Sequence, residues 1–197
     1  MRTISLSIII TLSLGSVAFA QDYAVVHDRE RGELSEGARA PTRSGMLSVI
    51  QNGAPSAIAS TLEYGERVEC NACVPVLAGY LLEHPNADVR RMAAWWLRRR
   101  ILAVGELMVH LRTTLASDAN PVRRARAADA IGEFMDSNGV TALVAAAGGD
   151  ADATVRSSSV RALGRLNHPA AIPTVAAALE DGDAGVRRAA IGIIMRL

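Results

Sequence analysis

From about residue 44 onward, apolar residues recur at the three- and four-residue spacing of amphipathic helices. Short clusters of Asp, Asn, Gly and Pro separate these segments, and no alternating strand pattern stands out. Half of the residues are hydrophobic but only 4% are aromatic, which favours helices packed through small side chains. The pattern predicts an all-α protein.

The helical pattern repeats along the chain. A pair that ends in Arg, followed by small residues on the next helical turns, occurs four times: Val89 with Arg90, Arg123 with Arg124, Val155 with Arg156, and Val186 with Arg187. Successive copies are 34, 32 and 31 residues apart, which is the length of one helix-turn-helix unit. Each recurring Arg is expected to bind acidic residues or carbonyl groups of the preceding turn. Asp88 and Asp118 are expected to cap helices or form turns there.

The repeat is clearest in DATVRSSSVRALG at residues 152–164. This sequence resembles the HEAT-repeat family, and the short period with Ala-rich second helices looks like the subtype named after phycobilisome lyases. The resemblance covers residues 73–197 and implies an α-solenoid of about four helical hairpins that acts as a protein-binding or scaffolding module. It also implies that the second helices face the ligand. The pattern departs at Arg123, where an aliphatic residue is expected and Val122 is predicted to take its place.

Four segments are expected along the chain. Residues 1–20 resemble a signal peptide, with a basic start, an apolar stretch and an Ala-Phe-Ala cleavage site; an uncleaved anchor is the alternative. Residues 21–43 are rich in charge, Gly, Ser and Pro and predict a flexible leader. Residues 44–72 predict a degenerate helical cap before the solenoid of 73–197. The protein is therefore expected to be exported, periplasmic or secreted, with no stable membrane anchor after cleavage.

Cys70 and Cys73 are the only cysteines in the chain. In an oxidising compartment, a pair at this spacing predicts a local disulfide that fixes the loop to the start of the next helix. A redox-active pair at a helix N-terminus is the alternative. Val74 stands where covalent haem attachment requires His, and a zinc site lacks two further ligands, so no metal or cofactor is expected.

A basic region surrounds two tryptophans. Residues 86–126 hold nine Arg and three acidic residues, a balance of +6. Helical spacing places Trp96 toward the core and Trp95 with three arginines; the predicted partner-binding residues are Arg91, Trp95, Arg98 and Arg99. The alternative is that Trp95 fills the groove against the next repeat. An acidic protein partner is expected, and nucleic acid is disfavoured by the export signal and the near-neutral net charge.

The final helix is apolar on nearly all sides. Its candidate association residues are Ile191, Ile193, Ile194 and Met195, which predict cover by a second copy or by a partner. The four histidines and the carboxylates show no catalytic spacing, so a non-enzymatic protein is expected. Two enzymatic alternatives stay open: thiol-disulfide chemistry at the cysteine pair, and a lyase-type activity that only the subtype resemblance implies.

Overall fold

The computed structural model describes residues 41–195, with the side chains of 101–103 excepted. The α-helices are α2 (Arg43–Asn52), α3 (Pro55–Tyr64), α4 (Cys73–Glu83), α5 (Ala87–Leu97), α6 (Ile101–Ser117), α7 (Pro121–Phe134), α8 (Val140–Gly149), α9 (Ala153–Leu166), α10 (Ile172–Ala177) and α11 (Ala184–Ile194). Short 3-10 turns are η1 (Ser137–Gly139), η2 (Pro169–Ala171) and η3 (Ala178–Glu180). The expected signal peptide at 1–20 and nearly all of the expected leader at 21–43 lie outside the described residues.

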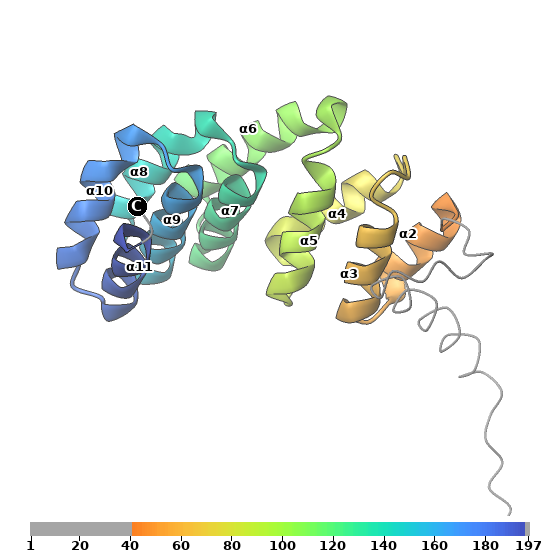
Figure 1. The fold of residues 1–197 in the computed structure, drawn as a ribbon, viewed down its shortest axis with the longest axis horizontal. Helices are drawn as coiled ribbons and strands as arrows, with labels where there is room; N and C mark the ends of the chain where they lie inside the picture. The colour runs from red at the N-terminus through yellow and green to blue at the C-terminus, as the bar shows by residue number, and fades with distance from the viewer. Residues whose placement is uncertain (1–40, 196–197) are drawn as a thin grey trace, which may run out of the picture. The chain divides into compact units, whose positions relative to one another are not determined.

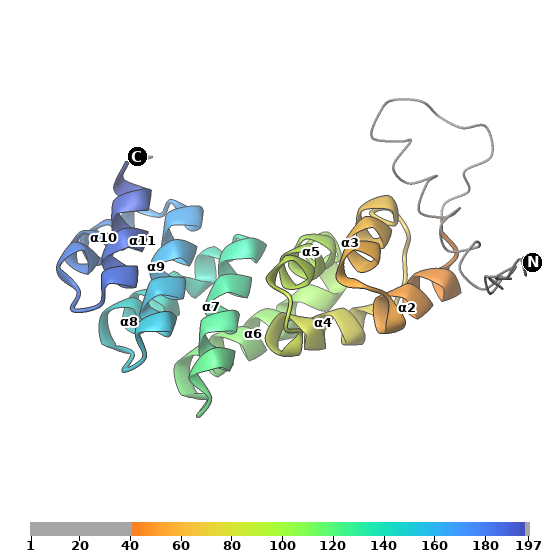
Figure 2. The same ribbon diagram turned by 90° about the horizontal axis from the view of Figure 1, so that it is seen from below.

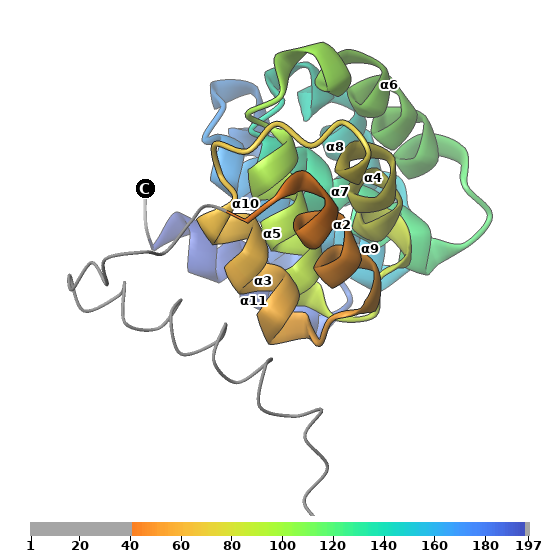
Figure 3. The ribbon, with the colours of Figure 1, turned by 90° about the vertical axis from the view of Figure 1, so that its right-hand side faces the viewer.

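The helices of residues 41–195 form an α-solenoid of stacked hairpins, as the repeat predicts. The second helices α3, α5, α7, α9 and α11 form one row, and their order along the stack can be followed in Figures 1 and 2. Figure 3, viewed from the N-terminal hairpin, separates α3 and α5 on one side from α4 and α6 on the other. The stack thus has two layers, with the core between them.

Each second helix from α5 onward begins at a polar cap that lies three residues before the aliphatic position of the repeat, which Arg123 occupies in α7. The caps accept hydrogen bonds from backbone N–H groups of the first turn; they are Asn86, Asn120, Asp152 and Asp183. The expectation that Asp88 and Asp118 cap helices or form turns is wrong for Asp88 and confirmed for Asp118, which is the C-terminal cap of α6 and accepts a backbone N–H within the turn. Asp88 lies inside the first turn of α5, while Asp118 stands before the cap of α7 and accepts the N–H of Asn120 at 2.8 Å.

Small residues set the close spacing of the second helices. A methyl group built on Gly132 of α7 would meet the backbone and side chain of Ala162 in α9 at 2.9 Å. One built on Gly164 of α9 would lie 2.5 Å from Ile193 of α11. Because no real side chain tolerates such contacts, glycine at these positions permits the packing of α7 on α9 and of α9 on α11.

Arg123 stands at a position where the repeat has an aliphatic residue, and Val122 does not take over that position. Val122 is exposed, so it does not fill the aliphatic position as expected. Arg123 itself occupies that position and forms ion pairs with Glu83 and Asp118, the second at 2.8 Å. The side chain replaces an apolar contact with a polar link between the end of α4 and the turn before α7.

The stack is looser at one step. Helix α7 packs along α9, whereas α5 contacts α7 over a smaller surface, and the two lie visibly farther apart in Figure 1. Helix α6 packs on α7 and α8, while α4 meets α7. The hairpin of α4 and α5 is thus offset from the regular stack that begins with α6.

Candidate functional site

The recurring arginines of the second helices bind the turns between repeats in a regular series. We call this series the ladder, and its arginines are Arg90, Arg124, Arg156 and Arg187. Arg156 donates through Nη1 to the carbonyls of Asp150 and Ala151 in the preceding turn, at 2.9 and 3.3 Å. Its Nε and Nη2 donate to the two carboxylate oxygens of Asp181 in the following turn, at 2.8 and 2.9 Å. Arg124 repeats this arrangement with Asp150, at 2.8 Å for both bonds. Arg124 and Arg156 therefore each bridge two turns with a bidentate grip on a carboxylate.

The ladder changes the acidity of its members. Hydrogen bonding from Arg124 lowers the pKa of Asp150, and hydrogen bonding from Arg156 lowers the pKa of Asp181. The same bonds raise the pKa of both arginines. The expectation that the recurring arginines bind the preceding turn is confirmed here and at Arg187, which donates to the carbonyls of Asp181 and Gly182.

Arg90 occupies the same repeat position but has no such carboxylate. Its Nη1 donates to the carbonyls of His84 and Pro85 at 2.7 and 2.9 Å, as the other ladder arginines do. Among the described residues, no carboxylate lies within ion-pair distance of its guanidinium. Burial, together with the nearby charge of Arg126, lowers the pKa of Arg90.

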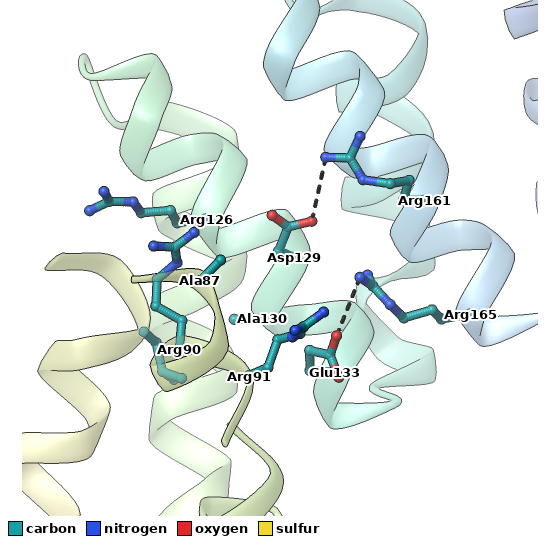
Figure 4. Close-up of a pocket in the computed structure, with 10 residues that line it drawn as sticks. Ala87, Arg90, Arg91, Arg126, Asp129, Ala130, Glu133, Arg161 and Arg165 are labelled. Carbon is teal, nitrogen blue, oxygen red and sulfur yellow. Dashed lines mark ion pairs between the residues drawn. The ribbon is translucent and has the colours of Figure 1, made fainter. Parts of the chain in front are cut away.

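Arg90 lines a cavity of about 140 Å³ between α5, α7 and α9, which we call the arginine cavity. Its lining residues are Leu81, Ala87, Arg90, Arg91, Arg126, Asp129, Ala130, Glu133, Arg161 and Arg165. Figure 4 shows the charged side chains that these three helices contribute, with Arg161 and Arg165 facing Asp129 and Glu133. The cavity lies at the step where α5 and α7 pack loosely.

The arginine cavity has an excess of positive charge. Two of its arginines pair with its two acids: Arg161 with Asp129 at 3.9 Å and Arg165 with Glu133 at 3.3 Å (Figure 4). Within residues 41–195, Arg126 has no ion pair and donates to the carbonyl of Leu82 at 2.6 Å, so a neutral group binds the guanidinium and its charge is uncompensated. The arrangement can bind an anion.

Residues 108–195 match the sequence profile of the HEAT repeats family. The chain contains HEAT repeats. The matched part begins within α6, and the preceding hairpin of α4 and α5 shows the same cap and the same arginine bonds to its turn. No similar sequence was found among curated proteins. Within residues 41–195, no helix has the length and hydropathy that crossing a bilayer requires.

Only one of the four predicted partner-binding residues lines the arginine cavity. Arg91 does so and pairs with Asp88. Arg98 lies just after α5 and donates to the carbonyl of Glu133 in α7 at 3.3 Å. Arg98 therefore joins the end of α5 to α7, whereas the ion pair of Arg91 stays within α5.

Trp95 is half-buried beside the core. Arg99 stacks over its ring, 4.1 Å from the ring centre, and donates to its carbonyl. Arg99 also pairs with Glu66 at 2.8 Å. One face of the indole is therefore covered from within the chain, which leaves less of Trp95 for a partner than the helical spacing suggested.

Trp96 lies in the core, as predicted, and joins α5 to the loop before α4. Its indole N–H donates to the carbonyl of Gly65 at 3.0 Å. Arg100 lies over the ring at 3.3 Å from its centre and donates to the carbonyls of Glu66 and Val68. Burial lowers the pKa of Arg100. These two residues have a structural role between repeats.

Cys70 and Cys73 are bonded to one another in the structure, with Cα atoms 5.3 Å apart, and both are buried. Cys73 is the first residue of α4, so the bond fixes the loop to the start of that helix. Burial disfavours thiol-disulfide exchange, since the attacking thiolate must reach a sulfur atom. Across residues 41–195, no cluster of three His, Cys, Asp or Glu side chains suits a metal ion.

The predicted association surface at the C-terminal helix needs one correction. Ile193 is only 6% exposed because it packs against Gly164 of α9, so it belongs to the core and does not line a surface. Ile191, Ile194 and Met195 are 48%, 42% and 82% exposed. A surface on α11 therefore consists of these three residues.

Sequence reasoning did not single out Arg126, Arg161 and Arg165 as site residues. Their signal was present as charged residues three to four apart on the second helices, such as Asp129 with Glu133. That spacing on α7 and α9 places the charges on one face of each helix. What was missing was the registration between helices, which the structure supplies.

Proposed function

We propose that the protein is an exported, non-enzymatic HEAT-repeat module that binds a protein partner on the face of α5, α7 and α9. HEAT repeats in general mediate protein–protein interaction, and the repeats here occupy residues 108–195. The observation that carries the proposal is the arginine cavity, where Arg90 and Arg126 have no carboxylate partner within residues 41–195. Partly desolvated arginines of this kind are frequent anchors at protein interfaces.

The size of the cavity supports a protein partner. Small-molecule and cofactor sites have volumes of roughly 300–1,000 Å³. The arginine cavity, at about 140 Å³, accommodates one or two side chains instead. A side chain inserted here would be held by charge, while the surrounding helices supply the rest of the contact surface.

Export is the second part of the proposal. It is supported by the signal-like residues 1–20 and by the bonded pair of Cys70 and Cys73, since disulfides persist mainly in oxidising compartments. The first residue of the protein recovered from its source cells should be Gln21. Recovery of the intact N-terminus from a cytoplasmic fraction would contradict export.

The enzymatic alternatives have less support. The cavity holds no cysteine, serine or histidine among its lining residues, so it offers no activated nucleophile. The cysteine pair is buried. If the pair is structural, the double variant Cys70→Ser with Cys73→Ser keeps any partner binding while losing stability; loss of a measurable disulfide-exchange activity in that variant would favour the enzyme instead.

Partner capture by charge-reversal variants tests the proposal. The chain from residue 21, immobilised in its oxidised form, is exposed to extracytoplasmic proteins of its source cells. Arg91→Glu and Arg161→Glu should each reduce recovery of the captured partner about tenfold or more, the loss of a charge-assisted contact. Arg188→Glu, an exposed arginine of α11 outside the cavity, is the matched control. Equal recovery with all three variants would place the site elsewhere.

A second copy of the chain is a further candidate partner, through Ile191, Ile194 and Met195. These exposed apolar residues lie together on α11, away from the arginine cavity. Self-association there leaves the face of α5, α7 and α9 available, so the two modes of binding are compatible.

A further inference from the structure

The ladder itself indicates what the arginine cavity lacks. At Arg124 and Arg156, Nη1 binds two carbonyls of the preceding turn, and the Nε and Nη2 pair holds a carboxylate. Arg90 makes the same two carbonyl bonds through Nη1. Its Nε and Nη2 have no carboxylate opposite them among the described residues. One step of a repeating arrangement is thus unfilled.

The turns on either side of Arg90 both differ from the later turns, and the difference in the following turn leaves this step unfilled. The residue two positions before the helix cap is Asp118, Asp150 or Asp181 in the later turns, but it is His84 in the turn before α5. The filled steps take their carboxylate from the following turn, as Arg124 does from Asp150, so the change at His84 does not remove the carboxylate expected for Arg90.

The carboxylate of the following turn, that of Asp118, is bound by a different arginine. By analogy with Asp150 and Asp181, the partner of Arg90 would be Asp118. That carboxylate is instead bound by Arg123 at 2.8 Å, in the same repeat. The loose packing of α5 on α7 accompanies this exchange and opens the cavity beside Arg90.

We propose that Arg90, assisted by Arg126, binds a carboxylate of the protein partner in the bidentate position that Asp150 and Asp181 fill elsewhere in the ladder. The inference rests on the proposed function and names the chemistry of its partner: a segment that presents Asp, Glu or a terminal carboxylate. Figure 4 shows the guanidinium groups of Arg90 and Arg126 close to one another on one side of the cavity.

The geometry favours a carboxylate over a phosphate group. A planar carboxylate matches the Nε and Nη2 fork, as the two filled steps show. Asp129 and Glu133 also line the cavity and would repel a dianion more strongly than a single negative charge. Burial and the charge of Arg126 lower the pKa of Arg90, and Asp129 lies near enough to oppose that lowering in part.

Calorimetric titration with defined peptides tests the inference. The probes are an oligoglutamate with blocked termini, the corresponding oligoglutamine, and a neutral peptide with a free C-terminal carboxylate. The oligoglutamate or the free C-terminus should bind the wild-type chain, and which of them does so identifies the source of the carboxylate. The blocked oligoglutamine should not bind.

Arg90→Lys is the decisive variant because lysine keeps the charge but loses the bidentate fork. Affinity for the binding peptide should fall about tenfold or more. Arg187→Lys is the matched control: Arg187 donates to the equivalent pair of carbonyls in the last repeat but lies outside the cavity. Absence of binding by either carboxylate probe, or equal affinity in Arg90→Lys, would overturn the inference.

A direct measurement on Arg90 covers the case in which the variant fails to fold. The Nε–H resonance of Arg90 in the wild-type chain should shift when the binding peptide is added. If the chemical shift of this resonance is unchanged by the peptide but changes in Asp118→Asn, Arg90 pairs within the chain. That result would overturn the inference.

The experiments distinguish failure of the proposed binding face from failure of carboxylate binding at Arg90. Partner capture that depends on Arg91 and Arg161, without any carboxylate binding, would refute the inference and leave the proposed function standing. Carboxylate binding at Arg90 with capture unaffected by those variants would refute the proposed binding face instead.

Discussion

Arg156 and Asp181 join α9 to the turn before α11 through two parallel hydrogen bonds of 2.8 and 2.9 Å. Asp181 also accepts the N–H of Asp183, the cap of α11. The same set of bonds links Arg124, Asp150 and the N–H of Asp152 one repeat earlier. Each carboxylate thus connects the arginine of one repeat with the helix cap of the next.

Removing one carboxylate of the ladder should destabilise the stack. Asp181→Asn keeps the shape of the side chain but loses the charge that Arg156 binds, so the free energy of unfolding should fall by about 2 kcal/mol. Urea unfolding followed by circular dichroism measures the change. Asp88→Asn is the control, because its pair with Arg91 is exposed and should contribute less than about 1 kcal/mol. Equal losses in both variants would contradict the structural role of the ladder.

The ladder should make the free energy of unfolding depend on pH. The pKa values of Asp150 and Asp181 are lowered in the folded protein, so their stabilisation is complete above the ordinary Asp pKa of about 3.9 and is lost as pH falls through the lower folded values. Unfolding free energy should therefore decrease below about pH 4. The double variant Asp150→Asn with Asp181→Asn should start lower and decrease less steeply; an unchanged slope would show that other groups control acid unfolding.

Glycine at the close helix contacts should resist substitution. Gly164→Ala places a methyl group 2.5 Å from Ile193, and Gly132→Ala places one 2.9 Å from the backbone of Ala162. Each should cost about 1–3 kcal/mol of stability in thermal or urea unfolding. Gly79→Ala, at an exposed position in α4 with open space around it, should stabilise by about 0.5–1 kcal/mol. Tolerance of all three would mean that α7, α9 and α11 are spaced more widely than described.

Substitution by Glu at two isoleucines of α11 should have different effects on stability. Ile193→Glu buries a charge in the core and should unfold the C-terminal repeat, whereas Ile191→Glu should leave stability nearly unchanged. If α11 mediates self-association, light scattering should show a dimer for the wild type and a monomer for Ile191→Glu. A wild-type chain that is monomeric at all concentrations would contradict self-association through α11.

The repeat spacing predicted most of the fold. The period of 31–34 residues, the polar turns and the small residues of the second helices all act locally, so they can be recognised along one chain. The bonds of Arg124 and Arg156 to their preceding turns could be predicted for the same reason. The burial of Trp96 followed from helical spacing alone.

The arginine cavity was not predictable because it depends on how two hairpins are offset. Arg123 occupies an apolar position and binds Asp118, which removes that carboxylate from the reach of Arg90. In the sequence alone, the charge at Arg123 is equivalent to a one-residue shift to Val122, and the four ladder arginines occupy the same repeat position. The difference between Arg90 and Arg156 arises because Arg123 binds Asp118 and because α5 packs loosely on α7.

Site-specific photocrosslinking tests the proposed binding face most directly. A photoreactive side chain at Arg91 lies at the arginine cavity, while one at the exposed Thr141 lies on α8 in the other layer of the stack. We expect illumination in the presence of the captured partner to yield a covalent product at Arg91 and little at Thr141. A product at Thr141 without one at Arg91 would contradict binding on the face of α5, α7 and α9.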